Sequence, residues 1–466
     1  MEKGLRYFLE KHSEAEPVSF HMPGHKGRNL YRKQDMLGLP GDLHRWDITE
    51  ISGADSLFQA ESVIAETMKK YETLYDCRKS YLLINGSSGG IISAILSCVP
   101  KGGKLAMARN CHKSVFNALT LGNITPVYIY PETIDEYGIQ GKVTPEAVEK
   151  IFMSEPDTDA VILPSPNYYG ICSDIKSIAE IVHKNNKILI VDQAHGAHLK
   201  FFEKDMPAAA EVLGADIVIN STHKTLASFT QTAVLNVCSN RVELAALEDK
   251  LQIMESSSPS YPLMATLDAN ADLIAGHGDR LMRQWKENID WFYDEAAKIP
   301  GLNLMRADGL DRTKLNIDMS FYGFDGAALE EYLIGKNIFV ELVSGNLVMC
   351  MTGIGNVRSD YEKLLNALRE LSDSRSMVEV EKPCRPKALS CKLRWHAVPE
   401  HKELVSLDEA SGKVCASSII PYPPGIPIVC PGEVLEEEVT EYIKELRMAG
   451  EKVIGVSEDM KVWVGK

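Results

Sequence analysis

Short apolar runs alternate with longer segments of helical periodicity between residues 81 and 237. The apolar runs are YLLI (81–84), KLAMA (104–108), TPVYIY (125–130), AVILP (160–164), KILIVD (187–192), DIVIN (216–220) and AVLNV (233–237). Strands that are apolar along their whole length and separated by helices indicate a mostly parallel sheet covered on both faces. AVLNV follows its predecessor without an intervening helix, so one antiparallel strand is possible. The pattern predicts a three-layer α/β domain.

The pattern changes after residue 258. A helical stretch from about 262 to 298 is followed by alternating strand and helix patterns, of which SDYEKLLNALREL (359–371) is the last. Ser359 and Glu362 have the spacing of a capping box at the start of that helix. Periodicity is lost over 373–392. We therefore predict a large domain at 61–260, a small α+β domain at 261–372, a linker at 373–392 and a separate C-terminal region at 393–466.

Composition and charge narrow the function classes. The chain has 466 residues, with 50 Lys and Arg against 65 Asp and Glu, and a formal net charge of -15. A general nucleic-acid binder or a protein of anionic membrane surfaces would need basic surface instead. The ten cysteines include no C-x-x-C pair, so neither a disulfide framework nor a metal site is predicted. The N-terminus has no apolar signal-peptide core, and we expect a cytoplasmic protein.

Unusual residues follow the predicted strands, where open α/β sheets bind ligands. NGSSGG (85–90) lies between a strand and a helix, and such a turn suits a phosphate, although a ligand-free turn is an equal alternative. It is neither a Walker loop nor G-x-G-x-x-G. Asp192 ends one strand, and Lys224 follows the next within NSTHKTLAS, where partial burial would lower its pKa.

A phosphate turn, a strand-end carboxylate and a strand-end lysine together are the parts that hold pyridoxal phosphate. Lys224 would form the Schiff base with the cofactor, and Asp192 would keep the pyridine nitrogen protonated. Ser221 and His223 flank the lysine and could reach the phosphate.

Several motifs resemble those of the Orn/Lys/Arg decarboxylase family. They are FHMPGHKG (20–27), DITEISGADSL (47–57), RNCHKS (109–114), DQAHGAH (192–198), STHK (221–224) and PYPPGIPIVCPGE (421–433). The resemblance implies a fold-type-I pyridoxal-phosphate enzyme with a seven-stranded large domain, a small domain and a C-terminal domain at 393–466. It also implies a homodimer with shared active sites, and it places the segment 1–60 near the active-site entrance and the dimer contact. HMPGHK begins at residue 21, so we expect no N-terminal wing domain.

The resemblance also assigns roles to single residues. Lys224 matches the Schiff-base lysine, Asp192 the pyridinium partner and His112 the histidine that stacks on the cofactor ring. Ser87, Ser88 and Gly89 match the phosphate turn that Ser221 and His223 complete, and His195 lies where the family packs His or Trp beside the ring. His21 and His25 are four residues apart, but Pro23 and Gly24 break a helix there, so a zinc site is not expected.

The expected reaction is decarboxylation of a basic L-amino acid, arginine first and then lysine or ornithine, feeding polyamine synthesis. An aminotransferase would need an arginine on the strand before the last small-domain helix, and that strand, NLVMCMT, has none before Arg358. Glu341 is the first candidate for binding the substrate side chain, with Glu50 and Asp55 of another subunit as further candidates. His223 or Lys224 could return a proton to the α-carbon. The alternatives are a fold-type-I aminotransferase or lyase and, more remotely, a non-catalytic regulatory relative.

Overall fold

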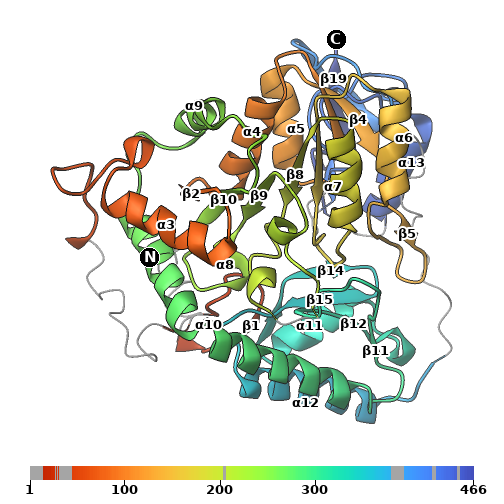
Figure 1. Ribbon diagram of the computed structural model, residues 1–466. Coiled ribbons are helices and arrows are strands. Elements are labelled where there is room, and N and C mark those ends of the chain that lie inside the picture. Colours follow the sequence, from red (N-terminus) through yellow and green to blue (C-terminus); the bar gives the residue numbers. More distant parts are fainter. Residues whose placement is uncertain are drawn as a thin grey trace, which may run out of the picture.

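The largest sheet of the described chain has seven strands (Figure 1). Its order is β2-β10-β9-β8-β7-β3-β4, and only β10 runs antiparallel to its neighbours. The bounds are β2 Lys79–Leu83, β3 Lys104–Ala108, β4 Thr125–Ile129, β7 Ala160–Pro164, β8 Ile188–Asp192, β9 Ile217–Asn220 and β10 Ala233–Val237. The predicted mostly parallel sheet is confirmed, and AVLNV is the antiparallel strand. The connection from β9 to β10 contains only the one-turn helix α8 (Thr222–Thr225), whereas a parallel crossover usually contains a longer helix that packs on the sheet.

The computed structural model describes residues 14–26, 28, 30, 45–202, 206–378, 393–421, 427–448 and 452–466. Most of the predicted linker 373–392 and the prolines of PYPPGIP lie outside these residues. The predicted domain limits stay predictions. None of the helices in the described ranges combines the length and the apolar character that crossing a membrane requires.

Helices cover the sheet on both faces because successive strand residues point to opposite sides. Leu83 packs in one apolar cluster with helices α4, α5, α6, α7 and α9. Its neighbours Leu82 and Ile84 pack in another cluster with α3 and the first part of α10. The helices are α3 Val63–Tyr75, α4 Gly86–Cys98, α5 Lys113–Gly122, α6 Pro145–Ser154, α7 Ile175–Lys184, α9 Leu244–Met254 and α10 Tyr261–Ala296.

A second unit surrounds the remainder of α10. Its antiparallel sheet has the order β11-β12-β15-β14, and α11 and α12 complete its core. The bounds are β11 Asn303–Leu304, β12 Lys314–Asp318, α11 Gly326–Gly335, β14 Leu342–Ser344, β15 Leu347–Met351 and α12 Arg358–Ser374. The sequence did not indicate that β1 (Val18–Phe20) pairs in parallel with β13 (Ile338–Val340), so that the N-terminal segment joins this unit. A hairpin of β5 (Thr133–Ile134) and β6 (Ile139–Gln140) lies between β4 and α6.

The capping box predicted for α12 is wrong. The helix is capped from Val357, whose N–H donates to Asp360 Oδ2 at 3.0 Å. Both oxygens of Asp360 also accept from the Arg28 guanidinium, at 2.7 and 2.9 Å. A tertiary ion pair therefore selects Asp360, rather than Ser359 with Glu362, as the capping side chain.

The C-terminal residues form a third unit with its own apolar cluster, drawn in blue in Figure 1. It comprises β16 Lys402–Ser406 paired with β19 Lys461–Gly465, β17 Ile420–Pro421 paired with β18 Val453–Ile454, and α13 Glu437–Met448. Short one-turn helices lie at Leu57–Gln59, Leu199–Phe201, Ala210–Val212, Ser320–Tyr322 and Leu407–Glu409.

Candidate active site

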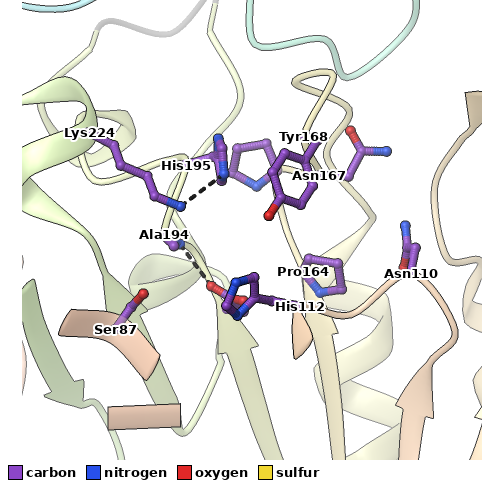
Figure 2. A pocket seen from close by; sticks show the side chains of 11 residues that line it. Ser87, Asn110, His112, Pro164, Asn167, Tyr168, Ala194, His195 and Lys224 are labelled. Carbon is purple, nitrogen blue, oxygen red and sulfur yellow. Dashed lines mark hydrogen bonds between the residues drawn. The ribbon is translucent and has the colours of Figure 1, made fainter. Parts of the chain in front are cut away.

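A cleft with about 370 Å³ of empty space, part of it open to solvent, lies at the carboxyl edge of the sheet (Figure 2). Its walls come from the ends of β7 and β8, the starts of α4 and α5, and the turn after β9. The lining residues are Ser87, Asn110, His112, Pro164, Pro166, Asn167, Tyr168, Asp192, Ala194, His195 and Lys224. Five residues named from the sequence, at 87, 112, 192, 195 and 224, thus meet in one place.

Lys224 projects into this cleft from α8. Its Nζ lies 3.0 Å from His195 Nε2. Burial lowers the pKa of Lys224, and the negative charges of Asp192 and Glu341 partly oppose that effect. A lysine that loses its proton more easily is a better nucleophile, which is the property that a carbonyl-binding lysine needs.

Asp192 ends β8 with a side chain that is almost entirely buried. Its Oδ1 accepts a hydrogen bond from the Ala194 N–H at 3.1 Å. Burial raises the pKa of Asp192, whereas the nearby Lys224 charge lowers it. A buried carboxylate that accepts this hydrogen bond is further stabilised by a cationic partner, so the site suits a protonated ring nitrogen.

The turn NGSSGG opens α4 at the floor of the cleft. Ser87 lines the cleft, and Ser88 and Gly89 lie with it in the first turn, whose backbone N–H groups have no partner within the helix. Ser221 Oγ is buried and is among the described side-chain atoms without a hydrogen-bond partner. Helix N–H donors together with an unsatisfied hydroxyl make a suitable cradle for a phosphate.

Glu255 lies beside that turn, which the sequence did not indicate. Its Oε2 accepts from the N–H groups of Ile84 and Asn85, at 3.1 and 2.9 Å. Its Oε1 is buried without a partner, and a β carbon at Gly89 would lie 3.2 Å from it. Burial raises the pKa of Glu255 to about 7. A negative charge therefore appears next to the phosphate cradle as pH rises through neutrality.

Two of the predicted histidines have fixed ring orientations. His112 caps α5, and its Nδ1 accepts from the Ser114 N–H at 3.3 Å, so a neutral ring carries its proton on Nε2. His223 Nδ1 lies 2.6 Å from the Thr232 carbonyl oxygen and must donate to it. Burial lowers the pKa of His112 to about 3 and that of His223 to about 4, so both rings are neutral at pH 7. His223 is not among the cleft-lining residues.

A buried ionic cluster joins the small unit to the β8 loop. Lys314 Nζ donates to the carbonyl oxygen of His195 and, at 2.6 Å, to Asp311 Oδ2. His198 Nε2 lies 3.1 Å from the same carboxylate oxygen, and all three side chains are fully buried. The His195 ring contacts that of Tyr168, with 4.6 Å between centroids. The cluster thereby holds the backbone that presents His195 to Lys224.

The HMPGHK segment lies between the lysine turn and the small unit. The Gly24 N–H donates to the His223 carbonyl at 2.7 Å, and the Gly24 carbonyl accepts from Gly355 N–H at 2.9 Å. A β carbon at Gly24 would collide with the backbone of Thr225 and Leu226, so this close approach requires glycine. At Gly24 the backbone of the motif therefore contacts the backbone of the lysine turn directly, with no side chain between them.

Glu341 and Lys26 both bond to backbone groups near this contact. Glu341 Oε2 accepts from the Met22 N–H at 2.7 Å. Lys26 Nζ donates to the carbonyls of His21 and Met351, at 2.6 and 2.8 Å. Burial lowers the pKa of Lys26 to about 7, and the charge of Glu341 opposes that shift. Glu341 is half-buried and close enough to Lys224 to influence its pKa.

Asp55 has a structural role in the described chain. Its two oxygens accept from five backbone N–H groups of residues 56, 61, 62, 64 and 65. Partial burial works against ionisation, but these bonds lower the pKa of Asp55 to about 2. Glu50 is exposed, and neither carboxylate lines the cleft. Asp55 therefore organises the start of α3 rather than the cleft of its own chain.

Sequence reasoning left several cleft residues without a role. Asn167 is structural, because its amide nitrogen donates to Gln140 and Gly141 carbonyls and its oxygen accepts from the N–H groups of Tyr169 and Ile171. Tyr168 and Asn110 line the cleft directly. The available signal was position, because both follow predicted strands at the ligand-binding edge.

Comparison with known proteins defines the class. The model of the Orn/Lys/Arg decarboxylase major domain matches residues 5–302, and that of the family's C-terminal domain matches 381–463. The chain belongs to the Orn/Lys/Arg decarboxylase family.

Individual relatives agree with this class. The chain is 32% identical to the arginine decarboxylase of Halalkalibacterium halodurans and 30% identical to that of Bacillus subtilis, in each case over 96% of this chain and 94% of the relative. Its fold matches the crystal structure of the Francisella novicida lysine decarboxylase with a TM-score of 0.77 at 18% identity, over 98% of this chain and 80% of that one.

The family implies pyridoxal phosphate, and the described residues fit it. Ser221 Oγ is a buried hydroxyl without a partner in the turn after β9, and Asp192 is a buried carboxylate close to the cleft lysine. A phosphate, a protonated ring nitrogen and a carbonyl carbon are the groups that these three features accept.

Glu255 generates a test of the phosphate cradle. At pH 8, Glu255→Gln should bind pyridoxal phosphate about tenfold more tightly than the unchanged chain, the effect of about one pKa unit of interaction. The two proteins should converge below pH 6, because Glu255 is then neutral in the unchanged chain. Fluorescence titration of the cofactor-free proteins at pH 6, 7 and 8 measures this. Asp249→Asn, an exposed change on α9, the helix that Glu255 directly follows, is the control, and parallel pH dependences of all three proteins would contradict the assignment.

Proposed function

We propose that this chain decarboxylates a basic L-amino acid, with arginine as the preferred substrate, to the amine and CO₂. The observation that carries the proposal is the arrangement of Lys224 and Asp192 after two adjacent parallel strands, beside the phosphate cradle of α4. Bound pyridoxal phosphate supplies an electron-accepting ring conjugated to the substrate α-carbon. Residues of this chain hold the cofactor, bind the substrate and move protons.

Each site residue predicted from the sequence near the cleft has a proposed role. Lys224 would hold the cofactor through its amine. Asp192 would hold the ring nitrogen of the cofactor in its protonated form, and His112, a neutral imidazole, would contact the ring. Ser221 and the first turn of α4 hold the phosphate, with Ser87, Ser88 and Gly89 as the contributing residues. His195 contacts the Lys224 amine and can accept or return its proton.

The protonation states agree with a proton relay at Lys224. Burial lowers the pKa values of both Lys224 and His195, so a proton shared over their 3.0 Å contact is held weakly. Such a pair can deliver a proton to a nearby carbon after CO₂ has left. His223, the other candidate donor, donates its Nδ1 proton to the Thr232 carbonyl. The pair Lys224–His195 is therefore the better placed acid.

Decarboxylation fits the cleft better than amino transfer. An aminotransferase holds the substrate carboxylate with a bidentate arginine. None of the described residues that line the cleft is an arginine. Arg358 lies over the ring of Trp291, 4.4 Å from its centroid, and Arg28 is paired with Asp360. A carboxylate left in an apolar, poorly solvated place favours loss of neutral CO₂.

Arginine preference rests on the relatives and on one carboxylate. Two relatives, 32% and 30% identical to this chain, carry the name arginine decarboxylase, whereas the lysine decarboxylase of matching fold is 18% identical. Glu341 is the proposed acceptor for the substrate cation because it is half-buried and close enough to Lys224 for its charge to raise the pKa of that lysine. A carboxylate offers a guanidinium two parallel acceptors.

The substrate assignment predicts a specific kinetic pattern. Separate incubation with arginine, lysine and ornithine should release CO₂ and amine fastest from arginine. Glu341→Gln should raise KM for arginine about tenfold or more and change kcat less, since the side-chain contact persists from ground state to transition state. The exposed Glu331→Gln on α11 serves as control. Amino transfer to a keto acid without CO₂ release from any of the three would refute the decarboxylase proposal.

We also propose that the enzyme is a homodimer in which Glu50 of one subunit approaches the cleft of the other. The support is the exposure of two large apolar side chains next to Glu50 in the sequence, with exposed fractions of 41% at Ile48 and 56% at Ile51. Monomeric surfaces seldom leave neighbouring large apolar side chains uncovered.

Light scattering tests the dimer directly. The unchanged chain should have about twice the 51.7 kDa mass of one subunit. Replacing Ile48 and Ile51 together by Asp should shift the mass toward one subunit and lower activity, because the charges would be buried in the interface. Leu121→Asp, an exposed apolar position on α5, should leave the dimer intact. A monomeric, fully active unchanged chain would rule the dimer out.

A further inference from the structure

Arg109 connects the large sheet to the C-terminal unit. It follows β3 directly and lies three residues before His112. Its guanidinium donates to the carbonyls of Pro427 and Ile428, at 2.8 and 2.6 Å, and to Glu433 Oε2 at 3.0 Å. The exposed side-chain fractions of Arg109 and Glu433 are 7% and 0%. Glu433 of the CPGE sequence (430–433) thus supplies a buried carboxylate to the start of the loop between β3 and His112.

The same guanidinium also packs against the large domain. Its Cζ lies 5.1 Å from the ring centroid of Phe116 and 5.4 Å from that of Tyr128. Phe116 is in the first turns of α5, the helix that His112 caps. One side chain therefore contacts both the helix that orients His112 and the C-terminal unit.

Glu433 is itself fixed in place. Its Oε2 also accepts from the Cys430 N–H at 2.6 Å, which closes a turn within the C-terminal unit. A buried ion pair is favourable only with good geometry and additional hydrogen bonds. Both terminal nitrogens of Arg109 and Oε2 of Glu433 have such bonds, whereas Arg109 Nε and Glu433 Oε1 are buried without a partner among the described residues. Arg109 thus meets three acceptors whose positions depend on the C-terminal unit being folded and docked.

The His112 ring depends on this region through α5. Its Nδ1 is held by the backbone N–H and the hydroxyl of Ser114, at 3.3 and 2.9 Å. A displacement of the first turn of α5 would therefore carry the ring with it. Arg109 restrains that turn in two ways: its guanidinium contacts Phe116, and it precedes His112 by only three residues.

We propose that Arg109 is a positioning residue through which docking of residues 427–433 sets the His112 ring against the cofactor. The proposal rests on the proposed function, since it takes His112 as the residue that packs on the cofactor ring. It assigns the C-terminal unit a role in catalysis: cofactor geometry is complete only when that unit is in place. A purely structural clamp would stabilise the fold without altering the cofactor environment.

Two conservative variants separate these roles. Arg109→Lys keeps the charge but replaces a planar fork by a single ammonium, which cannot reach all three acceptors. Glu433→Gln keeps the shape and removes the charge. Arg394→Lys is the matched control, because Arg394 pairs with Glu436 in the same unit but on its surface. Far-ultraviolet circular dichroism and thermal unfolding identify which variants are folded at the assay temperature.

Both variants should alter the visible circular dichroism of the bound cofactor and lower kcat about tenfold or more, with less change in KM. Arg394→Lys should match the unchanged chain. Folded variants that unfold at lower temperature yet keep the cofactor signal, kcat and KM would overturn the proposal. The unchanged enzyme assayed alongside keeps this failure distinct from a failure of the proposed function, which would abolish CO₂ release there too.

A measurement on the unchanged holoenzyme covers the case in which neither variant folds. Under increasing urea, hydrogen exchange should show residues 109–116 and 427–434 losing protection together, with the visible cofactor signal changing at the same urea concentration. Opening of 427–434 while 109–116 stays protected and the cofactor signal is unchanged would equally overturn the proposal.

Discussion

Two adjacent parallel strands, β8 and β9, place a buried carboxylate and a lysine at the same edge of the sheet, and the site depends on keeping these opposite charges together. Burial raises the pKa of Asp192 and lowers that of Lys224, and each charge opposes the shift of the other. Burial of either charge without the other would be energetically unfavourable. A cofactor that offers a cationic ring nitrogen to the carboxylate and a carbonyl carbon to the amine satisfies both.

Three other parts of the chain contact the segments that carry the cleft residues, each through buried polar contacts. The small unit reaches the β8 loop through Lys314, which binds the His195 carbonyl. The N-terminal segment contacts the lysine turn through Gly24, where any side chain would collide. The C-terminal unit reaches the His112 loop through Arg109. Units that are far apart in the sequence thus each control one residue of the cleft.

Local signals were sufficient for the sheet and for its strand-end residues. The strands at 104–108, 160–164 and 233–237 have the bounds that their apolar runs predicted, and Asp192 and Lys224 could be placed because they follow such runs. Contacts between distant segments gave no local signal. The β1–β13 pairing joins residues about 320 positions apart, and Glu255 reaches the phosphate turn only through packing of α9 on α4. The cap of α12 was wrong for the same reason, since Arg28 selects Asp360.

The most direct test of the central claim is to locate the cofactor. The holoenzyme is reduced with borohydride, digested and analysed by mass spectrometry, in parallel with Asp192→Asn. The pyridoxyl group should lie on Lys224 in both proteins, while turnover of Asp192→Asn falls by about a hundredfold or more, because a neutral amide cannot hold the ring nitrogen protonated. A pyridoxyl group on another lysine, or near-normal turnover of Asp192→Asn, would contradict the account.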